Sequence, residues 1–125
     1  MTNPVILVED SPTQARILAD FLRDLDLQVV IAPDGPTALA AVMQYNPAAV
    51  ILDVNLPMMN GFQVARRLKR NAQTADIPII MLTCLDDIAY LKQGLDSGAD
   101  YYLPKDEQTA IELWKTLKSF GIVTV

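Results

Sequence analysis

Five consecutive apolar residues that end at an acid, Ala48 to Leu52 and then Asp53, restrict more than any other feature how this chain can fold. A strand that is covered on both faces of a parallel sheet has this continuous apolar composition. Pro57 and Gly61 then break the chain, and an apolar pattern with helical spacing begins at Phe62. Asp53 is therefore expected at the carboxyl end of a buried strand, in a loop that leads into a helix. In open α/β sheets, ligands bind at that edge.

The same order, a short apolar run followed by a segment with helical spacing, occurs five times along the chain. This alternation predicts an α/β, flavodoxin-like fold: a five-stranded, parallel, doubly wound sheet of order 2-1-3-4-5 with helices on both faces. A chain of 125 residues suits one domain, so we expect a single domain over 1–125, with its core at about 5–119 and a tail or linker at 120–125. The predicted strands are 5–8, 28–32, 48–52, 79–82 and 101–103, and the predicted helices are 12–24, 36–46, 62–70, 86–97 and 107–119.

Several helix ends carry recognisable signals. Ser11 or Asp10 can cap the first helix, Asn46-Pro47 ends the second, and Gly98 closes the fourth. Apolar residues at helical spacing predict the faces that pack on the sheet. These are Ile17, Leu18, Phe21, Leu22 and Leu25 in the first helix, Ala38, Leu39, Ala41 and Val42 in the second, Ile88, Leu91 and Leu95 in the fourth, and Ile111, Trp114 and Leu117 in the last.

Composition excludes several classes of function. The net charge of −5 argues against direct binding to nucleic acid, and the basic cluster Arg66, Arg67, Lys69 and Arg70 is interpreted as a solvated helix face. The chain has no histidine and one cysteine, Cys84, so a classical zinc site, a Ser-His-Asp triad and an intramolecular disulfide are excluded. We expect Cys84 to be a small buried side chain. No run approaches the roughly 20 apolar residues that span a bilayer, so we expect a cytoplasmic protein with no membrane insertion.

Side chains with complementary chemistry end four of the predicted strands. Glu9 and Asp10 follow the first strand and Asp53 ends the third, so three carboxylates are expected to meet at one edge of the sheet. They would repel one another unless a cation neutralised them, and Mg²⁺ is the hard cation that carboxylate and phosphate oxygens recruit. Thr83 ends the fourth strand with a hydroxyl group, and Lys105 follows the fifth with a positive charge. Together these groups suit a phosphoryl group carried on a carboxylate.

The chain resembles the receiver domain of two-component response regulators, of the chemotaxis-regulator-like kind, from about Val5 to Ser119. The segments that carry the resemblance are ILVEDSP, LDVNLPMMNG, IIMLTC and GADYYLPK, in this order and at matching separations. The resemblance implies a phosphorelay switch that takes a phosphoryl group from a sensor histidine kinase or a phosphotransfer protein. Such a switch would catalyse only its own phosphorylation and dephosphorylation, and it would signal to a downstream protein or a fused output domain. A homodimer is left open.

The resemblance also implies a role for each matching residue. Asp53 would be the phosphoacceptor, and Glu9, Asp10, Asp53 and the backbone carbonyl of Asn55 would bind Mg²⁺. Lys105 would pair with a phosphoryl oxygen, and Thr83 would move to hydrogen-bond another. Tyr102 would be the switch aromatic that follows this movement, although packing alone would also account for it.

Two residues depart from the family pattern. Asp106 follows the lysine where proline is usual, and because a cis peptide without proline is unfavourable, we predict a trans Lys105-Asp106 bond with Asp106 capping the last helix. Cys84 follows the threonine where alanine is usual, which would narrow access to the site slightly.

Three alternatives stay open. One is an aspartate-nucleophile phosphatase, although Asn55 holds the place of the second aspartate that such enzymes of the haloacid dehalogenase type use as general acid. Another is a receiver-like interaction module that is not phosphorylated. The third is a flavodoxin-like cofactor binder, which a yellow purified protein would reveal.

Overall fold

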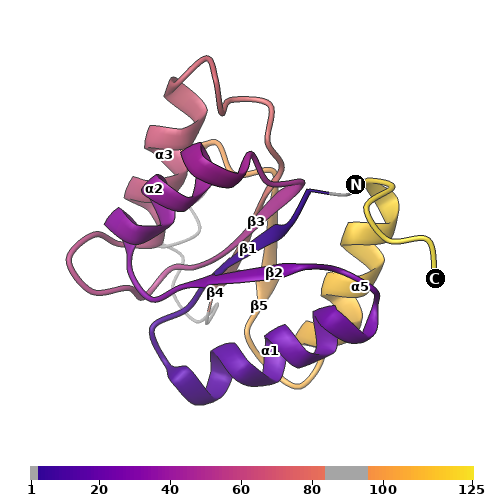
Figure 1. Ribbon diagram of the computed structural model, residues 1–125. Helices are drawn as coiled ribbons and strands as arrows, with labels where there is room; N and C mark the ends of the chain where they lie inside the picture. Colours follow the sequence, from indigo (N-terminus) through magenta and orange to yellow (C-terminus); the bar gives the residue numbers. More distant parts are fainter. Residues whose placement is uncertain (1–2, 84–95) are drawn as a thin grey trace.

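The computed structural model describes residues 3–83 and 96–125 of the chain. Its five strands form one parallel sheet of order β2-β1-β3-β4-β5, as the sequence predicts (Figure 1). All residues of β1, β3 and β4 are buried, which explains their continuous apolar composition. The strands are β1 (Val5–Val8), β2 (Val29–Ala32), β3 (Ala49–Asp53), β4 (Ile79–Thr83) and β5 (Tyr101–Pro104).

The described helices pack in pairs on the two faces of the sheet. In Figure 1, α2 and α3 lie on one face, and α1 and α5 lie on the other. Alternate residues of each central strand therefore point into two separate apolar clusters. Ile6 and Leu52 belong to the cluster under α2 and α3, whereas Leu7 and Ile51 belong to the one under α1 and α5. The helices are α1 (Pro12–Asp24), α2 (Gly35–Tyr45), α3 (Gly61–Arg70) and α5 (Thr109–Ser119).

Side-chain caps fix the starts of three helices. Ser11 caps α1, and Asp34 Oδ1 accepts a hydrogen bond of 2.7 Å from the backbone N–H of Thr37 at the start of α2. Asn60 and Gln63 form a reciprocal capping box at α3, which the sequence prediction did not identify. At the other end of α2, Asn46 adopts a left-handed conformation with φ of 46°, and this confirms the predicted stop.

Two predicted core positions are wrong. Ile17 is 63% exposed and Ile111 is 50% exposed. The helix faces that pack on the sheet contain smaller residues instead, because α1 buries Ala15 and Ala19 together with Leu22. Ile17 lies two residues from each of these alanines, and two residues turn a helix by about 200°, so its side chain points away from the sheet.

Helix α5 shows the same effect and also begins later than predicted. Its buried residues are Thr109, Leu113, Thr116 and Leu117, which leaves Ile111 on the outer face. The helix starts at Thr109 instead of Glu107. Asp106 does not cap this helix directly, because its Oδ1 accepts from the Gln108 N–H in the turn before it, at 2.7 Å.

The prediction that the basic cluster of α3 is a solvated face is wrong for Lys69. Its side chain is 18% exposed, and its Nζ lies 2.8 Å from Asp100 Oδ2. The same ammonium group donates to the carbonyl oxygens of Ala75 and Ile77, at 3.0 Å each. Asp100 in turn accepts from the N–H of Ile79, the first residue of β4. Lys69 therefore ties the 71–78 connector to the segment before β5.

The C-terminal segment, which the sequence pattern did not place, packs against α5. Gly121 turns the chain with φ of 77°, and Val123 is buried in the cluster under α1 and α5. The indole N–H of Trp114 donates to the carbonyl oxygen of Val125 at 2.9 Å. Residues 121–125 thus extend this apolar core.

Other predictions fall on the segment that is not described. Cys84 and the stripe Ile88, Leu91 and Leu95 lie outside the described residues. Asp96 and Ser97 are helical, and Gly98 follows them with φ of 83°, as expected for a glycine that ends a helix. Among the helices of the described ranges, none is long and apolar enough to cross a membrane.

Candidate functional site

Three carboxylates meet at the carboxyl edge of the sheet. Glu9 and Asp10 follow β1, and Asp53 ends β3, the strand beside β1 in which Leu52 pairs with Val8. Glu9 and Asp53 are buried, at 2% and 3% exposure, whereas Asp10 faces solvent. One oxygen from each acid lies within 4.8 Å of the others. The predicted convergence of these residues is therefore present.

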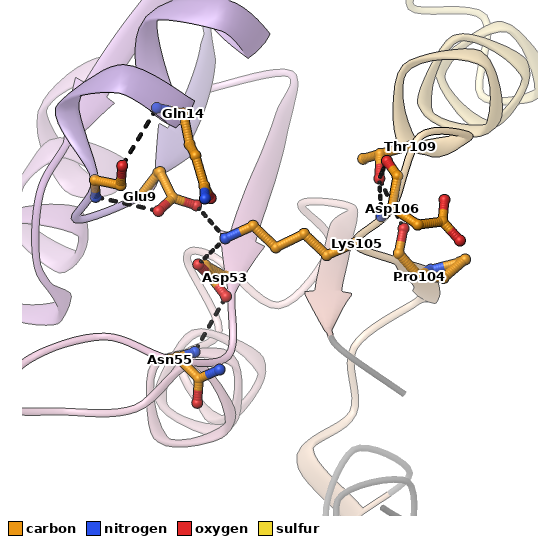
Figure 2. Close-up of polar contacts among 9 residues, drawn as sticks. Glu9, Gln14, Asp53, Asn55, Pro104, Lys105, Asp106 and Thr109 are labelled. Atoms are coloured by element: carbon orange, nitrogen blue, oxygen red, sulfur yellow. Dashed lines mark hydrogen bonds and ion pairs between the residues drawn. The ribbon is translucent and has the colours of Figure 1, made fainter. Parts of the chain in front are cut away.

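Lys105 brings a positive charge to two of these acids. Its Nζ lies 2.6 Å from Asp53 Oδ2 and 2.9 Å from Glu9 Oε2. Figure 2 shows the side chain extended from the turn after β5 towards the acids. The backbone supports this direction, because the N–H of Lys105 donates to the carbonyl oxygen of Thr83 at 2.9 Å.

Burial and charge shift the pKa values of two of these groups. Burial raises the pKa of Glu9 above its ordinary 4.5, and the neighbouring Asp53 raises it further, against the opposing effects of Lys105 and the Ser11 N–H. Burial alone would lower the pKa of Lys105, but its contacts with Asp53 and Glu9 outweigh burial, so the pKa is raised above 10.5. The ammonium group is consequently charged throughout the neutral range.

The backbone around the acids fixes their orientation. Asp53 Oδ1 accepts from the N–H of Asn55 at 3.1 Å, and Glu9 Oε1 accepts from the N–H of Ser11 at 3.1 Å. Gly61 packs directly against this loop: a Cβ at that position would collide with the carbonyl oxygen of Asp53. Glycine is therefore required here by close approach of the backbone.

The oxygen atoms of this site fit a hard divalent cation. Mg²⁺ prefers oxygen ligands and usually keeps several waters while it binds one or two carboxylates. The acid cluster supplies such oxygens, and beside it Asp10 and Asn55 line an open hollow of about 390 Å³. Two buried acids that share one lysine leave a net negative charge, which a cation in the hollow would offset. The pocket can thus bind Mg²⁺.

The other predicted site residues, Thr83 and Tyr102, lie on the paired strands β4 and β5. Thr83 is the last residue of β4 and is 4% exposed. Tyr102 is half-buried and packs against the cluster under α2 and α3, with its hydroxyl 3.4 Å from Ser97 Oγ. Its neighbour Tyr101 points the other way and meets Phe120 edge-on, with ring centroids 5.2 Å apart. Tyr102 is therefore the aromatic of β5 on the face of the sheet that α2 and α3 cover.

The sequence of residues 5–118 matches the response regulator receiver domain. The chain belongs to this family. A receiver domain is typically a non-enzymatic signalling module. The DNA-binding dual master transcriptional regulator RpaA of Synechocystis is 40% identical over 101 residues, which cover 81% of this chain and 42% of that protein. The chain thus spans less than half the length of this relative.

Solved receiver domains share the fold. That of a signal transduction histidine kinase from Syntrophus aciditrophicus has a TM-score of 0.90 and 31% identity, over 95% of this chain and 89% of that one. That of a sensor histidine kinase from Pseudomonas aeruginosa has a TM-score of 0.87 and 26% identity, over 96% and 98%. The latter contains a magnesium ion coordinated in its active-site cleft. The acidic cluster of this chain is typical of a receiver Mg²⁺ site.

The sequence prediction missed residues that stabilise the turn and the helix next to the site. Thr109 bonds to the turn that carries Lys105, and the Asn60–Gln63 box starts the helix that Gly61 opens beside Asp53. The spacing of Asn60 and Gln63 is a recognisable capping signal. Nothing comparable in the sequence points to Thr109, because its hydroxyl acts through a turn whose shape the sequence does not reveal.

Proposed function

We propose that this receiver domain accepts a phosphoryl group on Asp53 from a phosphohistidine of a sensor kinase or a phosphotransfer protein. The observation that carries the proposal is the contact of Lys105 with Asp53 and Glu9 at an edge that also presents Asp10. Two buried acids that contact the ammonium group of Lys105 and lie beside a hollow that can hold a metal ion are suited to the reversible gain of a phosphoryl group.

In the proposed reaction, a carboxylate oxygen of Asp53 forms a bond to phosphorus while the bond from phosphorus to the donor histidine nitrogen breaks. Glu9, Asp10, Asp53 and the carbonyl oxygen of Asn55 would hold Mg²⁺, which would supply charge neutralisation to the phosphoryl oxygens. Lys105 is already beside the Asp53 carboxylate and pairs with a phosphoryl oxygen as the charge moves outwards. Hydrolysis of the resulting acyl phosphate returns the carboxylate.

The proposed output is a changed surface. A phosphoryl group adds about −1.5 to −2 charges, so Lys105 and the Thr83 hydroxyl gain a new anionic partner. Lys105 and Thr83 are linked through the backbone at the ends of β5 and β4, and Tyr102 lies further back on β5, where it pairs with Met81. A shift at Thr83 would therefore reach Tyr102 and the surface that a downstream protein or a fused output domain contacts.

The test is phosphorylation by acetyl phosphate with Mg²⁺, followed by intact mass. We expect wild type to gain about 80 Da, and we expect no gain after EDTA treatment or with Asp53→Asn. Asp20→Asn is the matched control, because it makes the same change at an exposed acid of α1 and should label as wild type does. Equal labelling of wild type and Asp53→Asn would contradict the proposal.

The same reaction separates the switch from a phosphatase. A switch consumes acetyl phosphate only as fast as its own acyl phosphate hydrolyses, whereas a phosphatase also turns over small phosphate esters repeatedly. The side chain of Asn55 offers no ionisable proton to a leaving group, which favours the switch. Rapid multiple turnover of several phosphate esters would favour the enzyme.

A further inference from the structure

The turn that connects β5 to α5 is closed by the hydroxyl group of Thr109. Thr109 Oγ1 accepts from the N–H of Asp106 at 2.8 Å. The same oxygen lies 2.8 Å from the carbonyl oxygen of Pro104 and 2.7 Å from that of Asp106, within donating distance of both. Thr109 itself is 6% exposed, so water has little access to replace these contacts. Figure 2 shows this group of bonds beside Lys105.

This arrangement follows from the residue at position 106. Aspartate has a backbone N–H that needs an acceptor, and the turn places Thr109 Oγ1 where that hydrogen points. The threonine hydroxyl carries one hydrogen and can accept as well as donate, so it joins the N–H of Asp106 to a carbonyl oxygen on either side of Lys105. The backbone on both sides of the lysine is thus bonded to one buried side chain.

Lys105 needs such support because its ammonium group must reach two acids at the far end of a flexible side chain. Its own N–H is fixed to the carbonyl oxygen of Thr83, on the β4 side of the turn. Thr109 fixes Pro104 and Asp106, the residues before and after it. A change in the direction of the Lys105 Cα–Cβ bond would move Nζ away from its contacts of 2.6 and 2.9 Å.

We propose that Thr109 is a positioning residue for Lys105: its hydroxyl holds the 104–109 turn so that the ammonium group stays against Asp53 and Glu9. The consequence for phosphorylation rests on the function proposed above, whereas the effect on Lys105 itself does not. Thr109 acts through the lysine and touches neither the acids nor the phosphoryl group.

The chain provides a matched control for this test. Thr116 lies on the same helix, is 7% exposed, and donates its hydroxyl hydrogen to the carbonyl oxygen of Glu112 within α5. Thr109→Val and Thr116→Val make the same chemical change at similar burial, but only the first alters the turn beside Lys105. Thr109→Ser keeps the hydroxyl group and serves as the rescue, and Thr109→Ala is a second way to remove it.

The first measurement follows Lys105 in the metal-free protein by NMR. A held ammonium group gives its ε-methylene two distinct proton shifts, and a freely rotating one averages them. We expect distinct shifts in wild type, Thr109→Ser and Thr116→Val, and averaged shifts in Thr109→Val and Thr109→Ala. Distinct shifts in a folded Thr109→Val or Thr109→Ala protein would overturn the proposal, whether or not Asp53 is ever phosphorylated.

The second measurement is the rate of phosphorylation by acetyl phosphate at saturating Mg²⁺. We expect Thr109→Val to slow phosphorylation about fivefold, which corresponds to the free energy of one typical hydrogen bond. Thr116→Val and Thr109→Ser should leave the rate unchanged. In a Lys105→Met background, Thr109→Val should slow it no further, because the residue through which it acts is gone. An equal slowing in both backgrounds would overturn the positioning role. Absence of labelling in wild type would instead refute the proposed function and leave the NMR result to decide this one.

Discussion

Replacing Lys105 with methionine tests whether the acid pair depends on its cation. The substitution keeps a long side chain but removes the ammonium group that contacts both Asp53 and Glu9. Two carboxylates that are 3% and 2% exposed are then left without their shared cation. Removing one partner of a buried pair is strongly destabilising when the remaining charge cannot be relieved.

The magnitude is limited by proton uptake. The pKa of Glu9 is already raised by burial and by Asp53, so Glu9 is the acid that will take a proton in the variant. Holding a proton that the unfolded chain releases with an ordinary pKa of 4.5 costs about 3.4 kcal/mol at pH 7 and about 1.4 kcal/mol at pH 5.5. We therefore expect Lys105→Met to lose up to about 3 kcal/mol at pH 7 and about half of that or less at pH 5.5.

The measurement is urea unfolding followed by circular dichroism, with EDTA, at both pH values. Lys115→Met is the matched control, because Lys115 is 60% exposed and lies 3.6 Å from Glu112 in a surface pair. Such a pair contributes less than about 1 kcal/mol, and this control should show little dependence on pH. Saturating Mg²⁺ should restore part of the loss in Lys105→Met, because the ion binds the folded state.

A loss that is the same at pH 5.5 and pH 7 would refute this reasoning, because it would show that proton uptake does not relieve the site. A loss no larger than that of Lys115→Met at pH 7 would show that the lysine does not neutralise the acids.

Three further predictions concern the scaffold. Gly61→Ala forces a methyl group against the carbonyl oxygen of Asp53 and should lower stability by about 1–3 kcal/mol in thermal unfolding; an unchanged melting temperature would contradict the close approach. The contact with Thr37 lowers the pKa of Asp34 below 3.8, so the stability that its charge contributes is complete above pH 3.8 and is lost as the pH falls through the lowered pKa. Asp34→Asn keeps the capping oxygen and should lose this pH dependence. If its difference in stability from wild type persisted in acid, the charge of Asp34 would not be its cause. Lys69→Met removes three contacts of one partly buried ammonium group and should cost about 2 kcal/mol in urea unfolding, more than Lys115→Met; equal losses would show that the connector does not need it.

The sheet could be predicted because periodicity and burial agree along this chain. Buried parallel strands leave continuous apolar runs, and the bounds of every predicted strand lie within one residue of those observed. The acids of the site could be predicted for a related reason: Glu9 and Asp53 stand out because each ends such a run.

Features that depend on packing could not be predicted in the same way. Ile17 was expected in the core because it was grouped with the apolar residues at helical spacing, but the face of α1 that is buried contains Ala15 and Ala19 instead. Lys69 was interpreted as a solvated surface charge. Its acceptors are backbone carbonyl oxygens of the 71–78 connector, and they come near the ammonium group only when that connector folds back against α3. Val123 was not placed for a similar reason, since its contacts come from distant parts of the sequence.

The sheet order divides the pocket into two parts that differ in how easily they open. Glu9, Asp10 and Asp53 are carried by β1 and β3, which have a strand on each side. Lys105 follows β5, which within residues 3–83 and 96–125 has a partner strand on one side only. Amide protons of an edge strand generally exchange with solvent through smaller fluctuations than those of interior strands. Fraying of β5 would move Lys105 away from the site and leave the three acids in place. The protein would then still bind a cation through the acids but would no longer bind an anion through Lys105.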